Sequence, residues 1–161
     1  MDAALIKLSQ EIGELLKSQK LTLSTAESCT AGRIAAAITA VSGSSMYFNG
    51  SVVSYCNEIK RNVLGVSDEL LETKGAVSKE VACAMHEGIL KVMNTDCAIA
   101  ITGFAGPLGG KEAPVGTIWI VVGNKKDARV KLLQVDKERE ENLTEATISA
   151  LQLLLNFLKN A

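Results

Sequence analysis

The sequence predicts a three-layer α/β/α domain built on a mixed, mostly parallel sheet of about five strands, with helices on both faces. Segments with the period of a strand alternate with helical segments along most of the 161 residues, as in α/β folds. Cys97–Ile101 and Thr117–Val122 are continuous apolar runs, typical of central strands buried on both faces. No repeat or linker interrupts the chain, and its length suits one domain, which we expect to cover residues 1–161.

The N-terminal part begins this alternation. Apolar residues at helical spacing predict a first helix that ends near Ser18–Lys20. The alternating Leu21–Thr25 predicts a strand, and the alanine-rich Arg33–Ala40 predicts a helix. Phe48–Tyr55 is rich in β-branched residues and contains Gly50-Ser51, so we expect a strand that is bulged or closely approached there.

Cap and stop residues delimit three helices in the middle of the chain. Asn57 is expected to cap a short helix that Gly65 ends. Ser67 is expected to start a second short helix, which ends before Gly75. The apolar face of Ser78–Met93 predicts a long helix.

The C-terminal part explains why the sheet should be mixed. Asn124–Asp127 predicts a tight turn from the second apolar run into a last strand over Arg129–Val135, and such turns join antiparallel neighbours. Lys137–Asn160 predicts a final helix with wide apolar coverage. Burial in an oligomer interface and burial within one chain explain that coverage equally well; we expect a homo-oligomer such as a dimer.

Composition argues against several classes of protein. The 17 Lys and Arg residues balance 18 Asp and Glu residues to a net charge of −1, whereas surfaces that bind nucleic acid are strongly basic. Met1–Lys20 carries charges throughout and lacks the apolar core of a signal peptide. No stretch reaches the roughly 20 apolar residues that cross a bilayer. We therefore expect a cytoplasmic protein with neither a membrane nor a nucleic-acid partner.

Few metal-ligating residues are available. The four cysteines form no C-x-x-C pair, and His86 is the only histidine, so the sequence predicts no metal site and no cofactor. His86 is interpreted as a surface or half-buried structural residue.

The first candidate site is the junction Thr25–Arg33, where a strand end runs into a helix start. Such a junction exposes unpaired backbone N–H groups and the positive end of a helix dipole, which suits an anion or oxyanion. Three candidate nucleophiles, Ser28, Cys29 and Thr30, lie in it. The alternative is an ordinary Ser/Thr cap on an alanine-rich helix.

The second candidate site is the glycine-rich Thr102–Gly110, directly after a buried strand. Its glycines allow a close approach to a ligand, and successive N–H groups can form an anion nest. It lacks the Lys-Ser/Thr ending of a P-loop and the G-x-G-x-x-G pattern of a dinucleotide-binding fold. The alternative is a flexible connector. Because ligands bind beyond the carboxyl ends of strands in open α/β sheets, the two junctions favour a shared pocket.

The third cluster is Ser54–Arg61, where Tyr55 ends a strand and Lys60 lies on the helix after it. A serine without a histidine partner needs a Lys or Tyr base, and Ser–Lys pairs are an established solution. The amine must be neutral, so burial or nearby cations would have to lower the pKa of Lys60. Read alone, Lys60 is more readily interpreted as an ordinary solvated helix residue.

Five motifs are spread along nearly the whole chain: Thr25–Gly32, Phe48–Lys60, Gly75–Ser78, Thr102–Pro107 and Pro114–Thr117. Together they resemble the CinA C-terminal domain family of competence/damage-inducible proteins, whose stand-alone members are nicotinamide-nucleotide amidases. The resemblance implies hydrolysis of the carboxamide of nicotinamide mononucleotide (NMN), which yields nicotinate mononucleotide and ammonia in pyridine-nucleotide salvage.

The resemblance also implies roles for individual residues. Ser28 matches the nucleophile, with Tyr55 and Lys60 as its catalytic partners and the proton passing to Lys60 directly or through Tyr55. The implied substrate-binding residues, which would hold the oxyanion or the ribose phosphate, are Thr30, Thr102, Gly103, Ala105, Gly106 and Arg139.

The chain departs from the family pattern at three places. It has Ala31-Gly32 and Gly50-Ser51 where the family has paired glycines, and Asn142–Thr144 where relatives carry further arginines. The alternative function is a non-catalytic nucleotide-binding or regulatory module linked to competence or DNA damage. Direct nucleic-acid binding is a weaker option because of the charge of −1.

Overall fold

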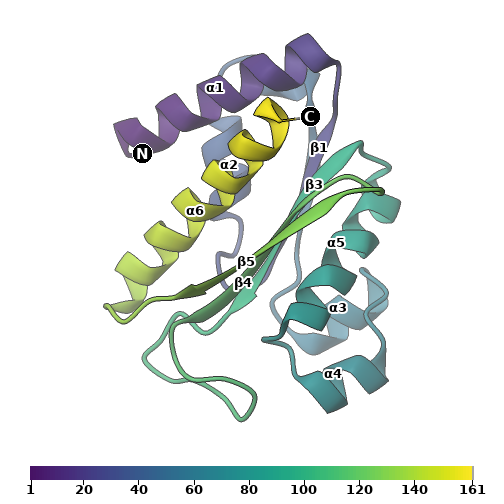
Figure 1. Cartoon of the computed structure of the whole chain (residues 1–161), viewed down its shortest axis with the longest axis vertical. Helices are drawn as coiled ribbons and strands as arrows, with labels where there is room; N and C mark the ends of the chain where they lie inside the picture. Colours follow the sequence, from purple (N-terminus) through teal and green to yellow (C-terminus); the bar gives the residue numbers. More distant parts are fainter. Residues whose placement is uncertain (161) are drawn as a thin grey trace.

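The computed structural model describes residues 1–160 and contains one five-stranded sheet in the order β2-β1-β3-β4-β5 (Figure 1). The strands are β1 (Leu23–Glu27), β2 (Phe48–Val53), β3 (Cys97–Gly103), β4 (Thr117–Gly123) and β5 (Ala128–Gln134). β1 pairs in parallel with β2 and β3, whereas β4 is antiparallel to both β3 and β5. Four strands therefore run in one direction and only β4 opposes them, which confirms the predicted mixed, mostly parallel sheet.

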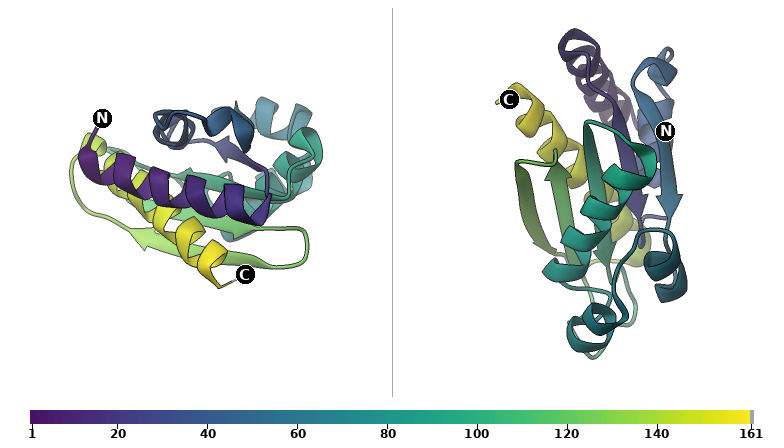
Figure 2. Two further views of the ribbon diagram at one scale, coloured as in Figure 1. Left: turned by 90° about the horizontal axis from the view of Figure 1, so that it is seen from above. Right: turned by 90° about the vertical axis from the view of Figure 1, so that its right-hand side faces the viewer.

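Helices cover both faces of the sheet and complete the three predicted layers (Figures 1 and 2). One face carries α1 (Ala3–Gln19), α2 (Arg33–Thr39) and α6 (Arg139–Lys159). The other carries α3 (Asn57–Asn62), α4 (Asp68–Lys74) and α5 (Lys79–Met93). A short 3₁₀ turn, η1 (Ser44–Met46), leads into β2.

The central strand β3 separates two apolar cores. Ile99 and Ile101 pack with α1, α2 and α6, whereas Ala98 and Ala100 pack with α5. Because both faces are covered, every residue from Cys97 to Thr102 is buried, as the continuous apolar run predicted.

The wide apolar coverage of α6 is explained within one chain. Its apolar residues lie against α1 and the sheet, and Leu143, Leu151, Leu154 and Leu158 are all buried. No oligomer is needed to account for them, and the expected homo-oligomer stays a prediction.

Three local boundaries differ from the sequence predictions. β1 begins at Leu23 and not Leu21, because Lys20 adopts a left-handed conformation that closes α1 and the Leu21 N–H returns to the Leu16 carbonyl. The cap of α3 is Cys56, so Asn57 is the first helical residue and the predicted Asn57 cap is wrong. The β2 bulge is at Asn49, one residue before Gly50-Ser51, since Leu23 pairs with Phe48 and Ser24 with Gly50.

This topology brings distant segments to one edge of the sheet. β1, β2 and β3 end at the same edge because they are parallel, and β5 also ends there, just before α6 begins. The chain passes from β1 to β2 on one side and then to β3 on the other, which is the topological switch point where α/β folds bind ligands. None of the helices within residues 1–160 combines the length and apolarity that crossing a membrane requires.

Candidate active site

A pocket of about 210 Å³ lies at this edge, between the ends of β1 and β3. Its lining comes from five segments and comprises Ser28, Cys29, Tyr55, Asn57, Lys60, Ala76, Val77, Thr102, Gly103, Phe104, Ala105, Gly106, Leu108 and Arg139. All of the predicted site residues except Thr30 are among them. Larger hollows lie along α6 and beside α5, but neither contains a serine bonded to a buried amine.

Ser28 is the first residue after β1 and is held by main-chain contacts. Its N–H donates to the Ile101 carbonyl of β3, 3.0 Å away, and its own carbonyl accepts from the Ala31 N–H. Ala31 and Gly32 then adopt positive φ angles of 47° and 94°, which turn the chain sharply into α2. The turn leaves the Ser28 side chain 7% exposed, facing the pocket.

Lys60 reaches this serine from α3. Its Nζ lies 3.0 Å from Ser28 Oγ and donates to the carbonyls of Ser54, at 2.8 Å, and Tyr55, at 3.3 Å. Only 2% of Lys60 is exposed. Burial lowers the pKa of this amine, and the neighbouring Cys56 and Cys29 partly oppose the shift. The reading of Lys60 as a solvated residue is therefore wrong.

These contacts suit both protonation states of Lys60. As an ammonium it donates to three oxygens and has no proton left over. As a neutral amine it keeps two N–H bonds to the carbonyls, and its lone pair then faces the Ser28 hydroxyl, which becomes the donor. A proton can pass between the two groups with no change of partners.

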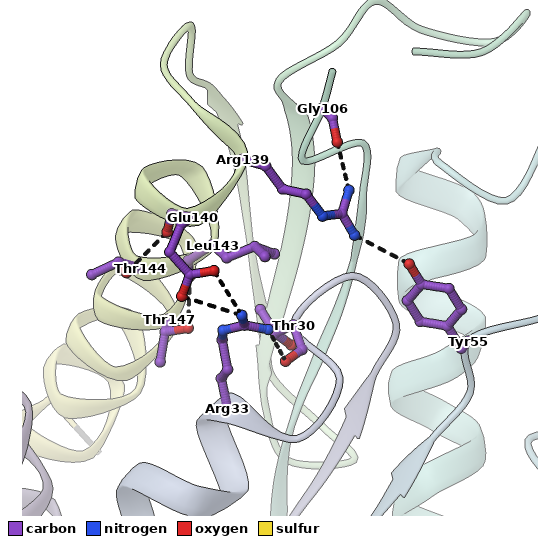
Figure 3. A network of polar contacts seen from close by, with 9 residues as sticks. All are labelled: Thr30, Arg33, Tyr55, Gly106, Arg139, Glu140, Leu143, Thr144 and Thr147. Carbon is purple, nitrogen blue, oxygen red and sulfur yellow. Dashed lines mark hydrogen bonds and ion pairs between the residues drawn. The ribbon is translucent and has the colours of Figure 1, made fainter. Parts of the chain in front are cut away.

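Tyr55 and Arg139 meet at the mouth of the pocket (Figure 3). The Tyr55 side chain is 59% exposed, and its hydroxyl accepts from Arg139 Nη2 at 3.2 Å. Arg139 also donates to the Gly106 carbonyl. Lys60 contacts the main-chain carbonyl of Tyr55, whereas the phenol hydrogen-bonds neither Ser28 nor Lys60 within the described chain. The geometry favours direct proton transfer from Ser28 to Lys60.

The two predicted threonines use their hydroxyls internally. Thr30 is fully buried outside the pocket lining and donates to Glu27 Oε1 at 2.8 Å. Thr102 lines the pocket but donates to the Ala76 carbonyl at 2.8 Å. What Thr30 offers a substrate is thus its backbone N–H.

Unpaired main-chain donors lie on two sides of the pocket. Across residues 1–160, the N–H groups of Cys29 and Thr30 after β1, and of Ala105 and Gly106 after β3, donate to no main-chain carbonyl. Both predicted junctions therefore retain N–H groups for an anion or oxyanion.

Cys29 is a poor rival to Ser28 as the nucleophile. It is 6% exposed, and burial raises the pKa of its thiol to about 12. A thiol with this pKa stays protonated near neutral pH and is unreactive.

Over residues 1–160, no three His, Cys, Asp or Glu side chains gather closely enough to hold a metal ion.

The sequence analysis missed Glu27, which precedes Ser28 and lies outside the pocket lining. It is the last residue of β1 and fully buried, and its carboxylate accepts hydrogen bonds from Thr30 and from the first turn of α2. A signal was present: an acidic residue ends a buried strand a few residues before a helix start, where a carboxylate suits the helix dipole.

A second connection anchors the same turn to α6 (Figure 3). Arg33 donates to the Thr30 carbonyl at 3.3 Å and pairs with Glu140, 3.1 Å away. Since Arg139 precedes Glu140, the turn over Ser28–Gly32 and the pocket mouth are joined through the first turn of α6.

Comparison with known proteins identifies relatives along the whole chain. The sequence model of the CinA C-terminal domain matches residues 5–158. Nicotinamide-nucleotide amidohydrolase PncC of Escherichia coli K12 is 40% identical over 99% of this chain and 98% of its own length. A CinA-like protein of Endomicrobium trichonymphae is 46% identical over 91% of this chain but only 35% of its own length. The chain thus spans about a third of the length of such longer relatives.

Solved structures agree with the sequence relatives. A CinA superfamily protein from Klebsiella pneumoniae superposes with a TM-score of 0.94 at 33% identity, covering 98% of this chain and 99% of that one. A competence/damage-inducible protein from Agrobacterium tumefaciens gives 0.93 at 35% identity over 98% and 97% of the two chains. The predicted family resemblance is confirmed.

Proposed function

Since the chain belongs to the CinA C-terminal domain family, we propose that it is an amidohydrolase that converts NMN to nicotinate mononucleotide and ammonia. The observation that carries the proposal is the 3.0 Å contact between Ser28 Oγ and the buried amine of Lys60 inside a pocket. Full-length similarity to E. coli PncC supports the choice of substrate. All of the proposed site residues lie within residues 28–139, so we propose that the 1–161 domain is active by itself.

The first half of the reaction forms an ester. Neutral Lys60 accepts the Ser28 proton while Ser28 Oγ attacks the carboxamide carbon, and the carbonyl oxygen becomes an oxyanion. We assign this oxyanion to the N–H groups of Cys29 and Thr30, because they follow the nucleophile directly and donate to no main-chain carbonyl within residues 1–160. The intermediate then collapses, the C–N bond breaks, and Lys60 returns its proton to the leaving ammonia.

The second half releases the acid. Water takes the place of ammonia and attacks the ester carbon while Lys60 accepts a proton from it. The second tetrahedral intermediate expels Ser28 Oγ, which regains its proton from Lys60. One amide bond is broken and one water consumed, and Lys60 ends the cycle as it began.

The dimensions of the pocket suggest how the nucleotide lies. A volume of about 210 Å³ is below the roughly 300–1,000 Å³ of complete ligand pockets, so it suits the pyridine ring, with the ribose phosphate at the mouth. There Arg139 is exposed and Ala105 and Gly106 offer N–H groups. A guanidinium fork can pair two phosphate oxygens at once. We propose that phosphate replaces the Tyr55 hydroxyl as a partner of Arg139.

The decisive experiment is ammonia release from NMN by the purified chain, with the product identified by chromatography. Ser28→Ala is the matched control for contaminating amidase. Turnover by the wild type and not by the variant supports the proposal. Tight NMN binding without turnover by the wild type would instead identify a nucleotide-binding module.

A further inference from the structure

We infer that Glu27 is a positioning residue that holds Ser28 against Lys60. This inference rests on the proposed serine mechanism. Glu27 touches neither the pocket nor the reacting atoms, so its effect would pass through the main chain on either side of the nucleophile.

The Glu27 carboxylate makes hydrogen bonds to both sides of the turn that carries Ser28. Oε1 accepts from the Thr30 hydroxyl at 2.8 Å and the Ile34 N–H at 3.0 Å. Oε2 accepts from the Ala35 N–H at 2.9 Å and lies 3.0 Å from the Thr25 hydroxyl. One side chain thus joins β1, the turn and the first residues of α2, and Ser28 lies between the joined points.

The same residue is connected to the base. The Glu27 carbonyl accepts from the Ser54 N–H at 2.9 Å, and the Ser54 carbonyl accepts from Lys60 Nζ at 2.8 Å. The Thr25 hydroxyl next to the carboxylate lies 2.7 Å from Ser51 Oγ on β2. Glu27 is therefore tied to the strand that leads to Lys60 as well as to the turn that carries Ser28.

A residue that only capped the N-terminus of α2 would not need to be a buried carboxylate. Gly32, the N-cap of α2, supplies no side-chain bond, and Glu27 takes over that task. Its carboxylate is fully buried with no Lys or Arg ion pair in residues 1–160, so hydroxyls and N–H groups alone offset its desolvation. A serine cap would satisfy a helix start with less desolvation. The short side chain of a serine cap, however, could not contact both β1 and α2 across the turn.

The backbone of the turn requires this external support. Ala31 has a φ of 47°, a left-handed conformation that is unfavourable for a residue with a Cβ. If the carboxylate contacts are lost, the turn can relax and the Ser28 hydroxyl can move away from Lys60. A misplacement of about 1 Å can cost about 100-fold in rate.

The test is Glu27→Gln, which preserves shape but places an NH₂ group where one main-chain N–H now donates. We expect kcat for NMN to fall about 10- to 100-fold, with KM within about threefold of the wild type because the pocket mouth is unchanged. The rate at which a fluorophosphonate labels Ser28 should fall in parallel, since labelling needs the Ser28–Lys60 pair but no nucleotide.

Ser67→Ala is the matched control, because it also removes a helix cap, from α4, but lies outside the pocket. It should lower the melting temperature and leave kcat and labelling unchanged. The inference would be overturned if folded Glu27→Gln kept the wild-type kcat, including the case in which only its KM rose.

If Glu27→Gln does not fold, Thr25→Val removes one contact to the carboxylate at nearly constant volume and should lower kcat several-fold; an unchanged kcat overturns the inference. Failure of the proposed function looks different, because the wild type itself would then release no ammonia.

Discussion

The two junctions that form the pocket are built in opposite ways. The turn after β1 is buried at Ser28, Cys29 and Thr30 and is densely bonded: Glu27, Ile101 and Arg33 hold it from three sides. The segment after β3 is open, and Leu108 at its tip is 80% exposed. Both follow parallel strands at the same edge of the sheet, so position alone does not account for the difference.

Two side chains of α6 anchor the open segment near its base. The Asn142 side chain, 1% exposed, donates to the Ala105 carbonyl at 2.8 Å, and Arg139 donates to the Gly106 carbonyl. Asn142 thus holds the segment from the first turn of α6. We propose a division of labour, in which the turn after β1 (the rigid turn) performs the chemistry and the segment after β3 (the open segment) recognises the nucleotide.

The largest effect should come from the nucleophile on the rigid turn. Ser28→Ala should lower kcat by about 10³- to 10⁶-fold, because it removes the hydroxyl that we propose to form the ester. Cys29→Ala should be mild, since burial raises the pKa of that thiol to about 12 and keeps it protonated. Ammonia release measures both. If a thiol-alkylating reagent abolished activity in the wild type but not in Cys29→Ala, the nucleophile would be Cys29.

The next effect should come from the base. Lys60→Ala should lower kcat by about 10²- to 10⁴-fold, and Lys60→Arg should be nearly as damaging, because an arginine keeps its charge and cannot accept a proton. Burial lowers the pKa of Lys60 below its usual 10.5, and in the proposed mechanism only the neutral amine can accept the Ser28 proton. The wild-type rate should therefore rise with pH and level off above that lowered pKa. Substantial turnover by Lys60→Arg would reduce Lys60 to a positioning charge.

On the open side of the pocket the expected change is in binding. Arg139→Ala removes charge-assisted bonds of about 1.5–3 kcal/mol each, so KM for NMN should rise about 10- to 100-fold with kcat little changed. The preference for NMN over nicotinamide riboside should shrink in this variant. Arg61→Ala is the control, because Arg61 pairs with Asp68 outside the pocket. Equal KM values for Arg139→Ala and the wild type would show that Arg139 does not recognise phosphate.

The smallest effect concerns the backbone of the rigid turn. Ala31→Gly should stabilise the fold by about 0.4–1 kcal/mol, because Ala31 has a φ of 47° that glycine adopts without strain. Ala36→Gly, in the exposed interior of α2, should destabilise it by about 0.5–1 kcal/mol. Urea unfolding of the two variants measures this contrast. A loss of stability in Ala31→Gly would mean that the turn is not strained.

Patterns within a few residues were enough to predict most of the fold. The apolar run Cys97–Ile101 became the buried central strand, and Ser67 and Ser78 cap the helices they were expected to start. The tight turn at Asn124–Asp127 joins the antiparallel β4 and β5. Each of these features depends on period, capping or turn chemistry, which neighbouring residues encode.

The sequence by itself therefore determined the α/β class, the order of the elements and the segments that meet at one edge of the sheet. The tertiary structure decided that Lys60 is buried against Ser28, 32 residues away, and that Arg139 pairs with Tyr55 across 84 residues. It also decided that Glu27, and not a local Ser or Thr, caps α2. The physical reason is that burial and desolvation arise only once strands align and helices cover them, and no local period records which side chains that packing brings into contact.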